Sequence, residues 1–310
     1  MSDTGATSKR FVAPDSRRDR AAAPDSRCGR ATALLALLLL TTIAVAATVA
    51  ACGSATKPRA ATLAATGTAV SADATALLRV SAAAMDTKVK TASFSMKMSS
   101  NTTLNGTAST TSMNIAGDIA DNGDSIRGKG TVTIAGAGTV GVELIGVTSG
   151  GRLVAYLRVA GVPGWKQLPP DQSDIATTSA QDIEAILSAA QRLQIVRKET
   201  VSGVLCDIVQ VDLDVVAYDK ASKNLGLADS VSKELHISQA DAVSELQNAT
   251  GTELLWIGRD DHLEYRETRD YVVDAGSQGK YEEGGSMDVS DFGKVVDPPI
   301  TAPLVSPTTI

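Results

Sequence analysis

The chain has 310 residues and a formal net charge of −6, from 29 basic and 35 acidic residues. An acidic chain without a basic cluster argues against a nucleic-acid-binding protein. Aromatic residues are few, with 3 Phe, 2 Trp and 5 Tyr, so the core must be filled mainly by small and aliphatic side chains, which leave space as easily as they pack.

Residues 1–51 are predicted to be a signal peptide with a long polar amino-terminal region. From Ala31 to Ala51 the chain has no charged residue, and this run is long enough to span a bilayer. The excess of basic over acidic residues before the run is typical of the cytoplasmic side of a membrane segment.

The apolar run closes with Val49-Ala50-Ala51-Cys52, which resembles a bacterial lipobox. In such proteins the cysteine receives a diacylglycerol, the signal peptidase cuts before it, and it becomes the acylated first residue. The sequence therefore predicts palmitate-type lipidation at Cys52 and a place on the outer face of the cytoplasmic membrane. A transmembrane anchor with an incidental cysteine is the alternative, and it too puts the rest of the chain outside that membrane.

Residues 52–70 are small and almost uncharged, which predicts a flexible, lipidated tether. A helix is expected next, with Ser71 as its N-cap. Its apolar residues form a narrow stripe, so we expect it to lie on a sheet rather than inside a bundle.

Between residues 93 and 159 the apolar period changes to two, which is typical of half-buried antiparallel strands. Val140, Val142 and Leu144 share one parity, and Leu153 lies in the following strand. Asn122-Gly123 and Gly150-Gly151 are hairpin-turn signals. Five or six strands without an intervening helix predict a meander whose apolar face needs a cover.

The cover is expected from the next helical segment. Ser179 and Asp182 have the spacing of a capping box, and Ile183, Ile186 and Leu187 follow as an apolar stripe. After this helix we expect a long strand from Gln194 to Tyr218, turned near residues 202–203.

The last part of the chain returns to strands. Residues 219–235 are polar and are expected to form loop and one short helix. Ser238 and Asp241 form a second capping box, opening a helix that Gly251 should end. Strands are predicted over 254–257, 263–273 and 281–289, before an extended tail rich in proline.

No residue pattern predicts a metal site or an enzyme. His236 and His262 are far apart, without cysteines or carboxylates at metal-ligand spacing. The glycines at 136, 138 and 141 fit a dinucleotide loop by pattern, but no helix follows them. Cys206 has apolar neighbours and no nearby base, so a buried, unreactive thiol is expected.

Several segments together resemble the LppX/LprAFG family of mycobacterial lipoproteins, which is related in fold to the LolA and LolB carriers. They are Tyr156 to Leu168 with Gly164-Trp165, Val201-Ser202-Gly203-Val204, Leu254-Leu255-Trp256-Ile257 with the acidic turn that follows, and Val289 to Lys294. The resemblance covers nearly all of 71–300. It implies a half-barrel sheet whose concave side holds the acyl chains of a lipid or glycolipid.

The predicted fold is therefore α+β, with a curved antiparallel LolA-like sheet and helices covering its concave face. One domain is expected over 71–300, with an extended tail over 301–310. The expected apolar cavity is lined by Val140, Val142, Leu144, Leu153, Ile183, Ile186 and Leu187.

The first functional hypothesis is a lipid-anchored envelope lipoprotein that binds acyl chains, as carrier or sensor, without cofactors or catalysis. Its partners would be the membrane, a lipid or glycolipid, and an envelope transporter. The alternative is an envelope scaffold or signalling lipoprotein that binds a protein partner without lipid. A hydrolase is a third hypothesis, disfavoured because no nucleophile–base motif is present.

Overall fold

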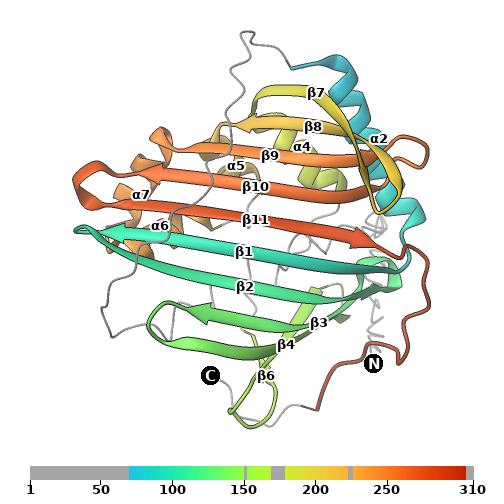
Figure 1. The fold of residues 1–310 in the computed structure, drawn as a ribbon, viewed down its shortest axis with the longest axis horizontal. Helices are drawn as coiled ribbons and strands as arrows, with labels where there is room; N and C mark the ends of the chain where they lie inside the picture. The colour runs from blue at the N-terminus through green and yellow to red at the C-terminus, as the bar shows by residue number, and fades with distance from the viewer. Residues whose placement is uncertain (1–69, 150–151, 169–178, 223–225, 305–310) are drawn as a thin grey trace, which may run out of the picture.

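The structure is a computed structural model that describes residues 70–149, 152–168, 179–222 and 226–304. Cys52, the predicted signal peptide and the predicted tether up to residue 69 lie outside these ranges. The described strands form a single sheet of eleven, in the order β6-β5-β4-β3-β2-β1-β11-β10-β9-β8-β7 (Figure 1). Within the described ranges we find no helix long and apolar enough to cross a membrane.

The first six strands confirm the predicted meander, because each pairs antiparallel with its neighbour in sequence. Their bounds are β1 Ala92–Leu104, β2 Thr107–Ala120, β3 Ser125–Ile134, β4 Gly138–Ser149, β5 Arg152–Val159 and β6 Lys166–Gln167. The predicted turn at Asn122-Gly123 joins β2 to β3, and both residues have positive φ, of 57° and 85°. Asn and Gly tolerate this left-handed conformation best. The predicted turn at 150–151 lies outside the described residues.

The other five strands form the second half of the sheet. They are β7 Ala190–Val201, β8 Val204–Leu213, β9 Thr250–Gly258, β10 Glu264–Asp274 and β11 Lys280–Ser290. The last strand returns to the first, since β11 pairs antiparallel with β1 and Val289 lies opposite Phe94. The two halves are thus one continuous sheet joined at its middle.

Five α-helices accompany the sheet in the described ranges: α2 Ala72–Lys88, α4 Ser179–Ala189, α5 Val215–Ser222, α6 Leu227–Leu235 and α7 Gln239–Glu245. Ser71 caps α2 as predicted, with its hydroxyl accepting from the amide of Ala74 at 3.4 Å. Ser238 caps α7 as predicted, accepting from the amide of Asp241 at 3.1 Å. The side chain of Ser179 lies outside the described part, so its predicted cap stays a prediction.

Two predictions for the segment after β7 are wrong. The expected strand to Tyr218 ends at Leu213, and α5 begins two residues later because Asp214 accepts a hydrogen bond from the amide of Ala217 at 3.0 Å. Such an N-cap stabilises a helix start. The short helix predicted within 219–235 is present as α6, after the end of α5. Gly251 lies within β9, whereas α7 ends earlier, at Glu245.

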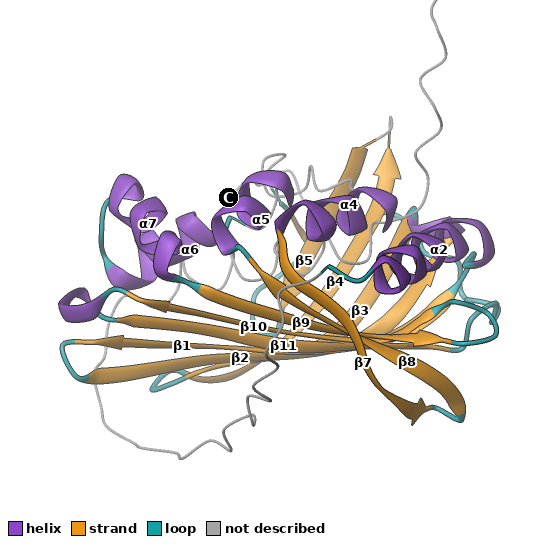
Figure 2. Ribbon diagram, turned by 90° about the horizontal axis from the view of Figure 1, so that it is seen from above, coloured by secondary structure: helices purple, strands orange, loops and turns teal. Residues whose placement is uncertain are grey.

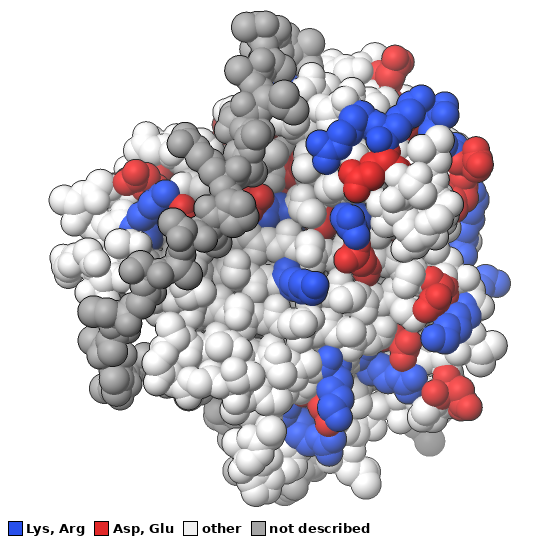
Figure 3. All heavy atoms as spheres, viewed as in Figure 1, with Lys and Arg blue, Asp and Glu red and all other residues white. Residues whose placement is uncertain are grey.

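All five helices lie on one face of the sheet, and β3 to β5 rise on that same side (Figure 2). That face is therefore concave, which confirms the predicted α+β class with helices on the concave side. Figure 3 views the opposite, outer face, where basic and acidic side chains are interspersed among neutral ones.

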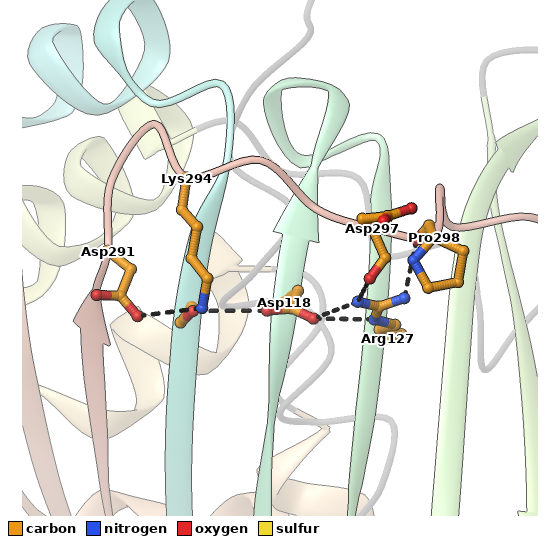
Figure 4. Close-up of polar contacts among 7 residues, drawn as sticks. Asp118, Arg127, Asp291, Lys294, Asp297 and Pro298 are labelled. Carbon is orange, nitrogen blue, oxygen red and sulfur yellow. Dashed lines mark hydrogen bonds and ion pairs between the residues drawn. The ribbon is translucent and has the colours of Figure 1, made fainter.

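The segment after β11 runs along the outer face of β2 and β3 (Figure 4). The guanidinium of Arg127 donates from Nε to Asp118 at 2.9 Å and from Nη1 to the carbonyl of Pro298 at 2.9 Å. Lys294 forms an ion pair with Asp291 at 3.7 Å. These contacts hold the segment on the outside and leave the concave face to the helices.

Candidate functional site on the concave face

The centre of the concave face is a methionine floor, which we define as Met96, Met98, Met113, Ile115 and Met287 from β1, β2 and β11. Met96 lies between Met287 on one neighbouring strand and Ile115 on the other, and Met98 lies opposite Met113. None of the five is more than 7% exposed. Because methionine is unbranched and polarisable, such a surface adapts to differently shaped apolar groups.

An apolar wall continues the floor on β3 to β5. Val142 and Leu144 are 6% and 2% exposed and belong to the same apolar cluster as the floor. Val140 shares their parity, as predicted, but is 39% exposed. The side chain of Leu153 lies outside the described part. Gly130 is the partner of Val142 on β3, and a Cβ at Gly130 would meet the backbone of Asn114 and Ile115 on β2.

The helical residues predicted to line the same cavity lie in a second apolar cluster. Ile183 and Ile186 of α4 are buried there, with Leu187 partly buried beside them, and they share this cluster with Leu193, Val209 and Val211 of β7 and β8. The structure thus brings Val142 and Leu144 of the predicted wall together, and it brings the α4 residues together. It does not place the two sets in one cluster.

Four charged side chains form a polar row between the two apolar clusters, and our sequence reasoning missed it. The row consists of Glu253 on β9, Glu267 and Arg269 on β10, and Glu283 on β11, all at most 8% exposed. Arg269 lies opposite Glu253, and Glu267 lies opposite Met287 of the floor. The alternation of the strands could have predicted the burial of these charged residues, since they have the same parity as buried Leu255, Tyr271 and Tyr281.

The carboxyl groups of the row differ in their hydrogen-bond donors. Arg269 donates to Oε1 of Glu267, from Nε at 2.9 Å. The hydroxyl of Tyr271 donates to Glu253 at 2.7 Å, and that of Tyr281 donates to Glu283 at 2.7 Å. The second oxygen of Glu253 has no hydrogen-bond partner of ordinary geometry among the described residues.

Burial changes the ionisation of these groups. Removal from water raises the pKa of Glu253 from 4.5 to about 7, although Arg269 and the hydroxyls of Tyr271 and Tyr218 act in the opposite direction. Burial likewise raises the pKa of Glu283, while Tyr281 and Arg269 lower it. Both groups therefore hold a proton more tightly than ordinary glutamates do.

The described residues offer little for covalent chemistry. Cys206 is fully buried, its thiol donates to the carbonyl of Val204 at 3.5 Å, and burial raises its pKa. His236 and His262 occupy turns with positive φ. In the described ranges, no three His, Cys, Asp or Glu side chains are placed to hold a metal ion. What the face does present is a deformable apolar surface beside buried carboxyl groups.

Comparison with known proteins found no matching family model and no matching curated protein. Among solved structures, the chain is similar to LprF from Mycobacterium bovis, with 15% identity, a TM-score of 0.40, and coverage of 75% of this chain and 98% of LprF. It is similar to Mycobacterium tuberculosis lipoprotein LppX, with 14% identity, a TM-score of 0.37, and coverage of 73% and 97%. A LolA superfamily protein from Nitrosomonas europaea aligns with 12% identity, a TM-score of 0.23, and coverage of 74% and 97%.

Proposed function

We propose that this chain is a lipid-anchored envelope lipoprotein that binds the acyl chains of a lipid or glycolipid on its concave face. It acts as a carrier or sensor on the outer face of the cytoplasmic membrane. The mechanism is partition, in which acyl chains leave the bilayer for an apolar surface without any bond being made or broken. An envelope transporter is the partner that would supply or remove the lipid.

The methionine floor is the observation that supports this proposal most. Transfer of apolar surface out of water stabilises by roughly 25 cal/mol per Å². The hydrocarbon part of an acyl chain makes no hydrogen bonds with water, so its binding breaks none. Met96, Met98, Met113 and Met287 lie on three adjacent strands and form one apolar cluster with the wall. Such side chains can change rotamer to receive a flexible chain more easily than branched ones can.

The ligand is tested on the full chain produced in a bacterial host that lipidates it. The protein is purified in detergent, delipidated, mixed with vesicles of labelled phospholipid and re-isolated, and the label that stays with the protein is counted. We expect about one lipid per chain. No retained label, together with a stable apo protein, would favour the scaffold that binds a protein partner without lipid.

The anchor is tested separately at Cys52, since acylation requires its thiol. We expect Cys52→Ala to lose all labelling by a fatty-acid probe and to keep the unprocessed signal peptide. Cys206→Ala is the matched control, because it removes the buried thiol and leaves the lipobox intact, so labelling should persist. Labelling of the Cys52→Ala variant would contradict the assignment.

A further inference from the structure

Helices α5 and α6 cover the polar row and touch the sheet through its immediate neighbours. The ring of Tyr218 on α5 stacks on Tyr271 of β10, with centroids 6.5 Å apart. Thr102 of β1 donates to Glu234 of α6 at 2.8 Å. Movement of these two helices away from the sheet would therefore bring water to the row.

The row carries more carboxyl groups than its cation can neutralise. Arg269 makes its hydrogen bonds to Glu267. Glu253 and Glu283 are left with neutral tyrosine donors. An ionised carboxylate in such surroundings is costly unless a cation or several donors meet it.

The other elements packed against Glu253 do not correct this imbalance. The titratable and charged groups around the row are Glu264, Glu267, Arg269 and Tyr271 of β10, Tyr281 and Glu283 of β11, Tyr218 of α5, Asp182 of α4 and Glu234 of α6. Among these groups Arg269 is the single cation. Loss of a proton from Glu253 therefore adds a negative charge to a buried cluster of side chains in which carboxyl groups already outnumber the single arginine.

We propose that the contact of α5 and α6 with the sheet is a proton-controlled gate over the concave face. The helices stay closed while Glu253 carries its proton, and they lift away from the sheet more readily once that proton leaves. Because Glu267 lies opposite Met287 of the methionine floor, the gate borders the surface to which we assign the acyl chain. The proposed function supplies only the identity of the ligand behind the gate; the pH-dependent opening itself does not depend on it.

The direction of the effect follows from linkage. In the closed form the pKa of Glu253 is raised from 4.5 to about 7, and in the open form water restores its ordinary value. Opening therefore releases a proton between these two pH values, and the opening equilibrium rises by up to about tenfold per pH unit. Well above pH 7 the Glu253 carboxyl is ionised in both forms, so its contribution becomes constant.

Amide hydrogen exchange of the lipid-free full chain in detergent tests the gate. Rates for peptides covering 215–222 and 227–235 are measured from pH 5 to pH 8 and corrected for the intrinsic pH dependence of exchange. We expect opening of these helices to rise by about fortyfold from pH 5 to pH 7. Peptides from β2 should show no comparable rise.

Two variants assign the effect to the buried carboxyl. Glu253→Gln should remove most of the rise, since it keeps the shape of the side chain without the titrating proton. Glu282→Gln is the matched control, because Glu282 lies on the outer face of β11 and pairs with Lys280 at 2.7 Å, and it should behave as the wild type.

A flat corrected profile in the wild type would overturn the gate, as would an unchanged profile in Glu253→Gln. Should the glutamine variant not fold, the wild-type profile still decides. The measurement needs no lipid, so failure to retain lipid would overturn the proposed function and leave the gate standing.

Discussion

The two halves of the concave face are built from different side chains, although one continuous sheet carries both. Under the helices, β7 and β8 present Leu193, Val209 and Val211, each 0% exposed. On β11, β1 and β2 the corresponding positions hold the methionines of the floor. The polar row lies at the boundary between the two.

This difference separates stability from binding. Branched aliphatic side chains have few rotamers and pack in one arrangement, so they specify a unique core. Methionine tolerates several arrangements at small cost. We therefore expect changes in the helix-covered half to act mainly on the free energy of unfolding, and changes in the floor and wall to act mainly on the ligand.

The largest effect is expected at Leu193, which is fully buried between β8 and the helices. Leu193→Ala should lower the free energy of unfolding by about 4 kcal/mol, because it removes apolar contact and leaves a cavity. Urea unfolding measures the loss. Val295→Ala is the control, since Val295 is 82% exposed and should change stability by less than about 0.5 kcal/mol. A loss below about 1 kcal/mol at Leu193 would mean that this half is not close-packed.

The next largest effect is a pH dependence of the free energy of unfolding, which comes from the polar row at the boundary between the two halves. The folded-state pKa of Glu253 lies above its unfolded value of 4.5, at about 7. Its contribution to stability is therefore fully present below pH 4.5 and is lost as the pH rises to about 7, for a total of roughly 3 kcal/mol. Urea unfolding at pH 5 and pH 7 should show a smaller decline in Glu253→Gln than in the wild type. Equal declines would contradict the shift.

The smallest effect on stability is expected in the wall. Val142→Trp should release bound lipid and lower the ligand-free stability by less than about 1 kcal/mol, because the methionines of the same apolar cluster can change rotamer to make room. Ile186→Trp in the helix-covered half is the matched change and should cost about 2 kcal/mol through overpacking. Lipid retention and urea unfolding are measured for both. If the Val142→Trp protein is destabilised and still keeps its lipid, the wall is part of the close-packed core and does not bind the ligand.

Most of the sheet could be predicted from the sequence. Alternation such as Phe94, Met96 and Met98 in β1 records which face is buried, since side chains alternate across a strand. Capping residues recorded the start of α2 and α7 in the same local way. The predicted strand failed at 214–218, where α5 begins, because the helical state of this short segment depends on contacts such as that of Tyr218 with Tyr271.

The candidate site was predictable only in part. The shared parity of Val142 and Leu144 followed from the period of two, and both are buried as expected. That α4 would join a different cluster did not follow, because helical spacing shows which face is apolar but not which strands it covers. The polar row was overlooked because charged residues on strands are usually read as solvent-facing.

The sequence by itself determined the local features that the structure bears out: the strand periods, the N-caps of α2 and α7 and the α+β class. Each depends on residues a few positions apart, whose geometry the backbone sets. The tertiary structure alone decided that β11 returns to β1, that the helices pack on the concave face, and that Glu253, Arg269 and Glu283 meet there. These features join residues on separate strands, and only the pairing register places such side chains together.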